Sequence, residues 1–128
     1  MFLGLRTVIY PVPDLAAARA WFSELLGAAP YFDEQFYVGW DVAGYELALV
    51  PAGGTATGPV TYWGVPDADV ALARLLAAGA SPREGVREVG GGIRVATVVE
   101  PAGSVLGVIE NPHFTLPAPT DAPPGPGR

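Results

Sequence analysis

The sequence contains no cysteine, no lysine and a single histidine, and these absences exclude several kinds of site. Without cysteine the chain forms no disulfide and offers no thiolate as a metal ligand or nucleophile. One histidine, His113, cannot supply a metal site that needs two imidazoles. All seven basic residues are arginine, which we ascribe to codon bias in a GC-rich genome. The chain therefore lacks most of the donors that transition metals prefer.

Long apolar runs are also missing. No run approaches the ~20 residues that cross a bilayer, and the first residues do not pair a basic stretch with an apolar core as a secretion signal does. The 128 residues carry a net charge of −6, with the acidic residues scattered rather than in blocks. Such a surface repels nucleic acid and anionic lipid and weakly favours a cationic ligand. We expect a cytoplasmic protein with no nucleic-acid or membrane partner.

One stretch, Leu5–Gly27, has the pattern of a buried strand that runs directly into a helix. Residues 5–12 are apolar and partly β-branched, and Pro13 cannot continue a central strand. Asp14 suits the N-cap, because its carboxylate can accept from the free N–H groups of the first helical turn. Gly27 favours the left-handed geometry that ends a helix. The residues at helical spacing between these two are Leu15, Ala18, Phe22 and Leu25.

The same pattern starts again in the second half of the chain, which indicates an internal repeat. Val65-Pro66-Asp67 repeats the corner Val12-Pro13-Asp14, and three short strand patterns follow each helical stretch. We expect an α+β protein of tandem βαβββ modules that form a cup-shaped sheet, since one four-stranded sheet with one helix leaves a face bare. The expected divisions are a first module at 1–51, a Gly-rich linker at 52–59, a second module at 60–114 and a disordered Pro-rich tail at 115–128.

The chain resembles the vicinal oxygen chelate superfamily in the order and spacing of its repeated pieces, VPDLAAARAWFSELLG, EPAGSVLGVIENP and NPHF. That superfamily contains glyoxalase I, extradiol dioxygenases, fosfomycin-resistance enzymes and bleomycin-binding proteins. The resemblance covers roughly Leu5–Phe114 and implies the glyoxalase/bleomycin resistance fold. It leaves the function open, because one fold hosts many activities.

Enzymes of this superfamily hold a divalent metal between the modules, on a histidine early in each first strand and a glutamate late in each last strand. At the two histidine positions this chain has Thr7 and Val60, or Thr61 if the register shifts by one residue. At the two glutamate positions it has Ala48 and Gly107. Glu46 lies on the same strand face as Ala48 and is the acidic residue that we place toward the cup. We favour a solvent-facing or strand-capping role for His113. The resemblance thus implies a scaffold without its metal ligands, and we expect no metal and no cofactor.

If the ligand positions face the cup, the alternation of strand side chains assigns the other cup residues. Thr7 and Ile9 then face the cup from the first strand, and Tyr62 and Gly107 face it from the second module. The aromatic strand 36–42 contributes one of two sets: Tyr37 with Gly39, or Phe36 with Val38 and Trp40. The expected ligand-binding residues are Thr7, Ile9, Tyr37, Trp40, Glu46, Tyr62, Arg94 and Gly107.

Each of these residues has a structural alternative. The aromatic side chains could fill a core or a dimer interface rather than stack on a planar or cationic ligand. Glu46 could pair with a cationic ligand group, or with an arginine of the chain such as Arg94. If Glu46 were buried without a partner, it could serve as a general base, which makes it the one weak catalytic candidate. Arg83, Arg87 and Arg94 could bind an acid, although a solvated sheet face is the simpler interpretation.

Two main hypotheses of function follow. The first is a homodimeric binding protein, similar to the non-metal bleomycin-resistance branch, which sequesters a small molecule, such as a cationic or aromatic one, in an apolar cup. The second is a glyoxalase-like lyase, isomerase or dioxygenase that uses a non-standard metal site or Glu46 as a base. A third interpretation is a divergent copy whose pocket has closed.

Overall fold

The computed structural model describes residues 1–52 and 58–115 and confirms the predicted order, strand–helix–three strands, twice over. The first set is β1 (Gly4–Val12), α1 (Leu15–Leu26), β2 (Phe32–Glu34), β3 (Tyr37–Val42) and β4 (Tyr45–Pro51). The second set is β5 (Val60–Gly64), α2 (Ala68–Ala77), β6 (Ser81–Glu88), β7 (Arg94–Val99) and β8 (Val105–Glu110). The predicted linker at 52–59 falls largely outside the described residues, and the predicted tail at 115–128 falls almost wholly outside them.

The two helices begin and end where the sequence predicts. The Asp14 carboxylate accepts a hydrogen bond from the Ala17 N–H at 3.0 Å, and Asp67 repeats this at Val70 over 3.1 Å. Each bond satisfies one of the free donors of the first turn. Gly27 ends α1 in the left-handed region, with φ of 67°. These caps fix the sharp corner between each first strand and its helix.

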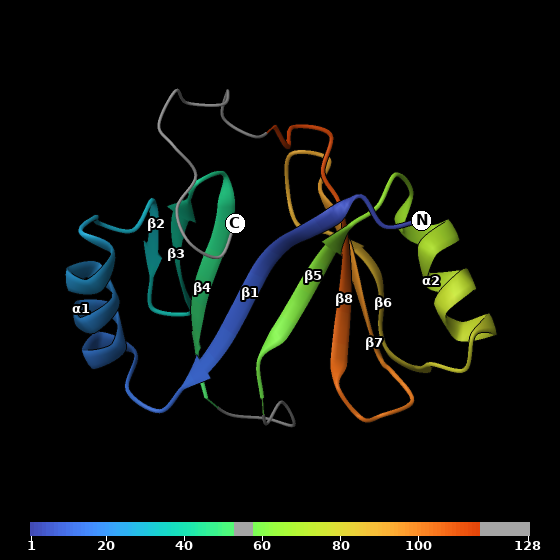
Figure 1. Ribbon diagram of the computed structural model, residues 1–128, viewed down its shortest axis with the longest axis horizontal. Helices are drawn as coiled ribbons and strands as arrows, with labels where there is room; N and C mark the ends of the chain where they lie inside the picture. The colour runs from blue at the N-terminus through green and yellow to red at the C-terminus, as the bar shows by residue number, and fades with distance from the viewer. Residues whose placement is uncertain (53–57, 116–128) are drawn as a thin grey trace, which may run out of the picture.

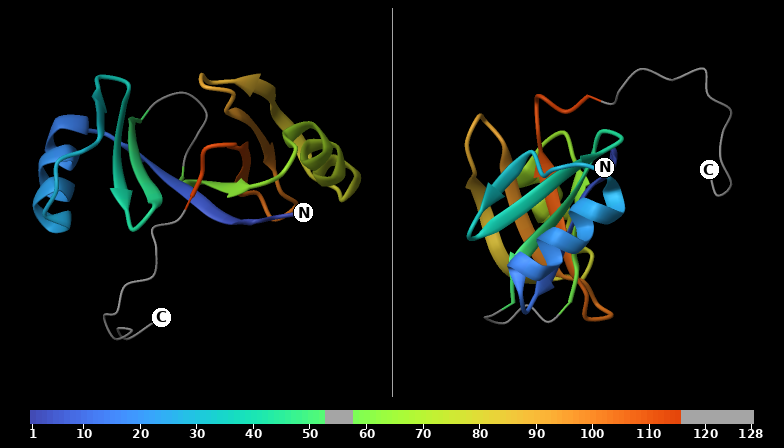
Figure 2. Two further views of the ribbon diagram at one scale, coloured as in Figure 1. Left: turned by 90° about the horizontal axis from the view of Figure 1, so that it is seen from above. Right: turned by 90° about the vertical axis from the view of Figure 1, so that its left-hand side faces the viewer.

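The strands form one sheet in the order β2-β3-β4-β1-β5-β8-β7-β6 (Figure 1). β1 pairs in parallel with β4 and antiparallel with β5, so the two modules join at the centre of the sheet. The sheet is bent, and the strands of each module rise as a wall on either side of β1 and β5 (Figure 2). Both helices lie outside these walls, α1 beside the first and α2 beside the second. The concave face is therefore free of helices.

Each helix covers a core of its own on the convex side. Val38, Trp40 and Leu49 are buried against α1, and Phe22 from that helix packs on them. The second core has the same place under α2 and contains Val65, Ala71, Ala96 and Val108. Burial of such side chains stabilises the fold by roughly 1.5–3 kcal/mol each. The core residues thus alternate with the side chains that face the cup.

Trp40 is a correction to the predicted cup residues. Its side chain is 1% exposed, its ring centroid lies 5.9 Å from that of Phe22, and its indole N–H donates to the Ala28 carbonyl oxygen at 3.2 Å. Of the two parity sets left open for β3, the structure has Tyr37 and Gly39 on the concave face. The alternative in which an aromatic side chain fills the core is the correct one for Trp40.

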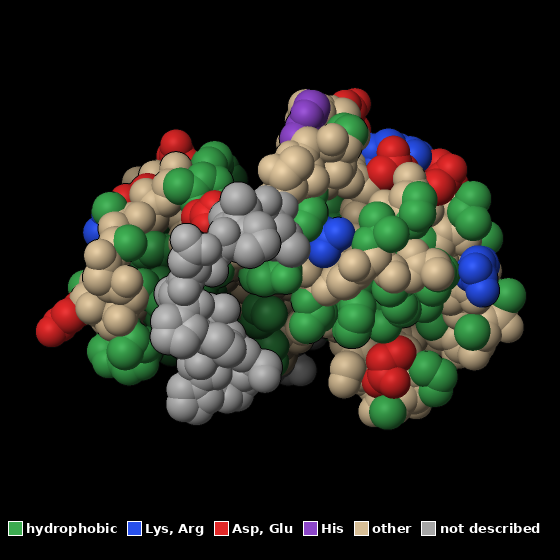
Figure 3. All heavy atoms as spheres, turned by 45° about the horizontal axis from the view of Figure 1, so that its top comes forward, with side chains coloured by type: hydrophobic (Ala, Val, Ile, Leu, Met, Phe, Trp, Pro, Cys, Tyr) green, Lys and Arg blue, Asp and Glu red, His purple; other side chains and the backbone are tan. Residues whose placement is uncertain are grey.

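The surface shows charged side chains of both signs scattered among hydrophobic ones, without a block of one sign on the face in view (Figure 3). Among the described residues, neither helix has the length and hydropathy needed to cross a membrane. The homodimer and the cytoplasmic location stay predictions.

We predict that Trp40→Ala lowers the free energy of unfolding by about 3–5 kcal/mol, because it opens a cavity under α1. Trp21→Ala is the matched control, since Trp21 is 60% exposed on the same helix–sheet unit, and should cost about 1 kcal/mol or less. Urea unfolding followed by circular dichroism measures both values. Equal losses for the two variants would contradict the assignment of Trp40 to the core.

Candidate functional site

A row of paired residues crosses the floor of the cup. Thr7 of β1 lies opposite Glu46 of β4 on one side and opposite Tyr62 of β5 on the other. Tyr62 in turn lies opposite Gly107 of β8. Because paired residues of neighbouring strands point to the same side of a sheet, this row lies together on the concave face. The predicted cup positions Thr7, Glu46, Tyr62 and Gly107 are thus brought together.

Three hydroxyl groups of the chain hold the Glu46 carboxylate. Its Oε1 atom accepts from Tyr37 at 2.6 Å and from Thr7 at 3.2 Å, and its Oε2 atom accepts from Tyr31. Thr7 is 7% exposed, so its hydroxyl is fixed in a buried position under the carboxylate. No arginine forms an ion pair with Glu46 among the described residues, and the expected alternative of an Arg94 partner is wrong. Within 1–52 and 58–115, the negative charge is therefore hydrogen-bonded but not paired with a cationic side chain.

Gly39 makes room for this group. A Cβ atom at Gly39 would lie 2.8 Å from Glu46 Oε2 and 3.3 Å from the Cε1 atoms of both Tyr31 and Tyr37. The carboxylate and the two phenol rings therefore converge over one point of β3 where the sheet has no side chain. A strand glycine often marks such a close approach.

In the second module a strand glycine, Gly107, likewise makes room for a side chain, here the Tyr62 ring. A Cβ atom at Gly107 would lie 2.5 Å from Tyr62 Cδ1, so the Tyr62 ring rests directly on the backbone of β8. Farther along the row, Arg83 donates to the buried Thr97 hydroxyl at 3.0 Å and to Glu84 at 2.7 Å. This wall therefore carries an aromatic ring backed by a paired arginine.

Burial and neighbouring charges alter the acidity of the three phenols. Burial, followed by the Glu46 carboxylate, raises the pKa of Tyr37 above its usual value, and the same two causes raise the pKa of Tyr31. Burial also raises the pKa of Tyr62, with Glu84 adding to the effect and Arg87 and Arg83 opposing it. All three phenols are therefore protonated at neutral pH, and Tyr31 and Tyr37 donate to Glu46.

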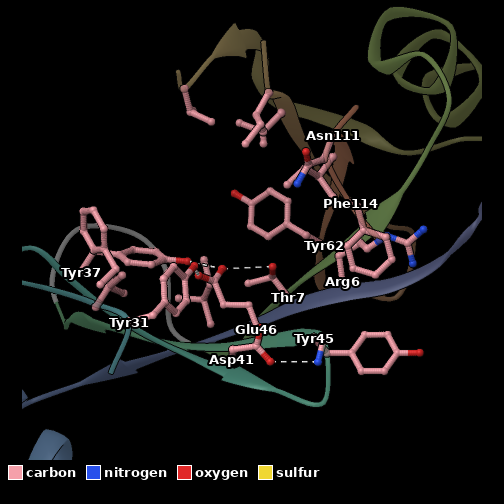
Figure 4. A pocket seen from close by; sticks show the side chains of 18 of the residues that line it. Arg6, Thr7, Tyr31, Tyr37, Asp41, Tyr45, Glu46, Tyr62, Asn111 and Phe114 are labelled. Carbon is pink, nitrogen blue, oxygen red and sulfur yellow. Dashed lines mark hydrogen bonds between the residues drawn. The ribbon is translucent and has the colours of Figure 1, made fainter. Parts of the chain in front are cut away.

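These residues line a cavity of about 870 Å³ that opens on the concave face (Figure 4). Tyr62 projects from one side of it, and Tyr31, Tyr37 and Glu46 lie across from it. Its charged lining residues are Arg6, Asp41, Glu46, Arg87 and Glu88. Its aromatic lining residues are Tyr31, Phe32, Phe36, Tyr37, Tyr45, Tyr62 and Phe114.

The segment after β8 closes one end of the cavity. The Arg6 guanidinium stacks on the Phe114 ring, with its Cζ atom 3.7 Å from the ring centroid. The His113 Nε2 atom lies 2.7 Å from the Gly91 carbonyl oxygen in the β6–β7 turn, so His113 ties this segment to the second module. Of the solvent-facing or strand-capping roles expected for His113, the structure shows an exposed side chain bonded to a turn carbonyl.

The structure places most, but not all, of the predicted ligand-binding residues at the cavity. Thr7, Ile9, Tyr37, Glu46 and Tyr62 line the cavity, and their role in ligand binding stays a prediction. Gly107 lies beneath the Tyr62 ring instead of lining the space.

Arg94 and Trp40 lie outside the cavity lining. Arg94 is a correction: it bonds Glu110 at 3.2 Å and also Asp69, beside α2. Because β7 side chains alternate, Arg94 points to the helix side and its neighbour Val95 lines the cavity.

Several lining residues were not predicted. Asp41 continues the Tyr37–Gly39 set on β3, so alternation along the strand could have found it. Arg6 could not be found in this way, because a register shift between Leu5 and Thr7 brings it to the cup side. Tyr31 lies in the stretch 30–35, which we expect to be a strand, but β2 begins only at Phe32, and the sequence alone did not assign its side chain to the cup.

The residues do not fit the metal that the resemblance implies. The four matching positions hold a threonine, a valine, an alanine and a glycine, and the Tyr62 ring fills the space above Gly107. Within 1–52 and 58–115, no three histidine, cysteine, aspartate or glutamate side chains come close enough to hold an ion together. In the described part of the chain, the floor offers the Glu46 carboxylate and, opposite it on β3, that of Asp41. Transition-metal sites need three or four donor side chains.

Comparisons with known proteins show the fold. A glyoxalase/bleomycin resistance protein/dioxygenase superfamily member from Vibrio splendidus 12B01 superposes with a TM-score of 0.67 at 17% identity, over 83% of this chain and 97% of that chain. Methylmalonyl-CoA epimerase from Mycobacterium tuberculosis gives 0.65 at 21% identity, over 85% and 88%. The Mn(II)-bound glyoxalase from Novosphingobium aromaticivorans gives 0.70 at 19% identity, over 95% of this chain and 42% of that chain.

Comparisons by sequence found no relative of this chain. No model of a protein family matches the chain, and no curated protein matches it by sequence. The chain therefore shares its fold with the vicinal oxygen chelate superfamily, as the resemblance implied.

We predict that the free energy of unfolding falls as the pH rises above about 10, the pKa of a phenol in the unfolded chain. The folded protein keeps the Tyr37 and Tyr31 protons at a pH where the unfolded chain releases them, so alkaline pH favours unfolding. Urea unfolding between pH 8 and pH 11 should show a smaller decline for the Tyr31→Phe/Tyr37→Phe double variant. An identical decline in both proteins would contradict the assigned cause.

We predict that Gly107→Ala lowers the free energy of unfolding by about 1–3 kcal/mol, because its Cβ atom would overlap the Tyr62 ring. The same substitution made in a Tyr62→Ala background should cost little, since the overlapping ring is gone. A double-mutant cycle by chemical unfolding measures the difference. A cost that is equal in both backgrounds would show that Gly107 does not serve to seat Tyr62.

Proposed function

We propose that the protein binds a small organic molecule in the cup, without the help of a metal ion. One observation carries the proposal: a carboxylate held by three hydroxyl groups faces an aromatic cavity on a floor that lacks metal ligands. The fold shared with glyoxalase and epimerase structures shows how such a cup is built, and the chemistry comes from this chain's own side chains.

The cavity has the size and lining of a small-molecule site. Its volume of about 870 Å³ lies within the usual range of roughly 300–1,000 Å³ for such pockets. Apolar and aromatic side chains form most of its wall, and a few polar groups stand at fixed positions. Phe36 and Tyr31 are 66% and 63% exposed, so a bound molecule would cover aromatic surface that now meets water.

The charges of the cup favour a cationic or neutral guest over an anionic one. Among the described residues, three carboxylates line it, Asp41, Glu46 and Glu88, against two arginines, Arg6 and Arg87. Arg6 already stacks on Phe114, and the whole chain carries a charge of −6. An aromatic wall adds attraction for cations through the negative faces of its rings.

A second candidate function is metal-free acid–base catalysis by Glu46. The observation in its favour is that Oε2 accepts a single hydroxyl among the described residues, from Tyr31, and so keeps one lone pair free. Its weakness is that Oε1 is occupied by Thr7 and Tyr37. Such an enzyme would be a lyase or isomerase of the glyoxalase type, or a dioxygenase.

The proposal predicts that a small organic molecule raises the melting temperature of the protein equally with and without a chelator. A ligand at about 100 times its Kd adds roughly 2.7 kcal/mol to the free energy of unfolding. A thermal-shift screen of organic cations and neutral aromatics, in EDTA and in buffer, measures this. Glu46→Gln should weaken the shift, whereas Glu24→Gln on the exposed outer face of α1 should leave it unchanged.

Two results would contradict metal-free binding: no shift by any compound in the screen, or a shift that disappears on chelation. Turnover of a hemithioacetal or catechol panel that persists in EDTA and is lost in Glu46→Gln would favour the second candidate instead.

A further inference from the structure

We infer that Arg6 anchors a carboxylate group of the guest, and that the guest is a zwitterion with a cationic group at its other end. This inference rests on the proposed function and names the class of its ligand. It follows from the way in which the chain holds the Arg6 guanidinium at one end of the cup.

A bulge in β1 brings Arg6 to the cup. The pairing of β1 with β5 shifts register between Leu5 and Thr7, so Arg6 is the residue left without a partner in that pairing. Such bulges often redirect a side chain next to a functional site. Arg6 therefore lines the same cavity as its neighbour Thr7, although regular alternation would place the two on opposite faces of the sheet.

The chain covers both faces of the Arg6 guanidinium. A Cβ atom at Gly64 would lie 2.7 Å from Nε, 2.8 Å from Cζ and 2.9 Å from Nη2, so the group lies flat on the backbone of β5. The Phe114 ring stacks on it, with 3.7 Å between Cζ and the ring centroid. Stacking leaves the N–H groups available in the plane of the guanidinium, and a group that is already ordered loses little freedom when it binds an acceptor.

Most of these N–H groups have no acceptor in the described part of the chain. Nη1 donates to the Leu5 carbonyl oxygen at 3.2 Å, which is the one hydrogen bond that Arg6 donates within 1–52 and 58–115. No carboxylate of these residues forms an ion pair with Arg6. The Nε–Nη2 edge presents two parallel donors, which is the arrangement that binds both oxygens of a carboxylate. Arg87 is a weaker candidate, because its side chain is 59% exposed and lies 3.9 Å from Glu84.

Asn111 offers a further donor at the same end of the cup. Its Oδ1 atom accepts from the His113 N–H at 2.9 Å, which leaves its NH2 group as a donor. Asn111 lines the cavity and lies on the same side of it as Arg6 and Phe114 (Figure 4). A carboxylate at this end would thus have a charged donor and a neutral donor nearby.

The other charges of the cup require the guest to be cationic elsewhere. Arg6 leans from β1 over Gly64 of β5. Glu46 leans the other way, from β4 over Gly39 of β3, and Asp41 adds a second carboxylate on that side. A simple anion at Arg6 would be repelled by these carboxylates, whereas a cationic group at the other end of the guest is attracted to them. The same repulsion disfavours a phosphate, which carries more negative charge than a carboxylate.

The test uses two zwitterions of different length, 4-(aminomethyl)phenylacetate and 8-aminooctanoate. Each is compared at pH 7 with its carboxamide, which is a cation of the same shape, by NMR titration of the full chain. We expect the better-fitting zwitterion to bind about tenfold more tightly than its carboxamide, because the carboxylate gains paired, charge-assisted hydrogen bonds at Arg6. The anion 4-methylphenylacetate should bind most weakly.

Three variants test whether Arg6 causes this difference. Arg6→Gln should reduce the affinity ratio of zwitterion to carboxamide to about one, because it removes both the charge and the paired donors. Gly64→Ala keeps Arg6 but places a methyl group where the guanidinium lies, so it should reduce the ratio several-fold. Arg74→Gln, which removes an exposed arginine of α2, is the matched control and should leave the ratio unchanged. A purely structural role of Arg6 would weaken zwitterion and carboxamide alike and keep the ratio.

The outcomes separate this inference from the proposed function. Equal binding of both zwitterions and their carboxamides, or a ratio that Arg6→Gln leaves unchanged, overturns the anchor and leaves metal-free binding in place. Tightest binding of 4-methylphenylacetate overturns the zwitterion in the same way. Failure of every organic compound, here and in the thermal screen, overturns both proposals.

Discussion

The antiparallel pairing of β1 with β5 is the contact on which the rest of the cup depends. It joins two modules that could not each bury both faces of a four-stranded sheet. It also sets the register that places Thr7 beside Tyr62, and through them Glu46 and Gly107, in one row on the concave face. Because strand side chains alternate, a shift of one residue between β1 and β5 would put Tyr62 and Gly107 on the opposite face of the sheet from Thr7 and Glu46. The pairing therefore decides the contents of the cavity as well as its shape.

In each wall of the cup a strand glycine makes room for side chains that pack directly over the backbone, but these side chains differ between the two walls. Over Gly39 a carboxylate and two phenol rings converge, and over Gly107 a phenol ring lies flat on the strand. Each occupant is already held by the chain: Glu46 by three hydroxyls, and Tyr62 by the backbone beneath it. A floor built in this way offers aromatic rings and the Glu46 carboxylate, with the Asp41 carboxylate opposite it on β3. We propose that it takes an organic guest.

The sequence predicted the fold well, because the signals for it are local and occur twice. The corner motif with Asp14 and Asp67, the capping glycine and the apolar spacing all act within a few residues of one another. Alternation along β1, β4 and β5 also placed Thr7, Glu46 and Tyr62 correctly. It failed where register or context decides: Trp40 required a choice between two parity sets, and Arg6 depends on a bulge in β1. Tyr31, whose hydroxyl completes the group around the Glu46 carboxylate, lies in the predicted strand 30–35, but the structure begins β2 one residue later, at Phe32.

The central claim is that the floor of this cup lacks the means to hold a metal ion and holds an ordered carboxylate instead. Anomalous X-ray scattering from crystals soaked in Mn²⁺ or Zn²⁺ tests it most directly, since a bound ion gives a peak at its own position. The account predicts no ordered peak among Thr7, Glu46, Tyr62 and Gly107, with the three hydroxyls still bonded to Glu46. A fully occupied peak between the two walls, ligated by Glu46, would contradict it.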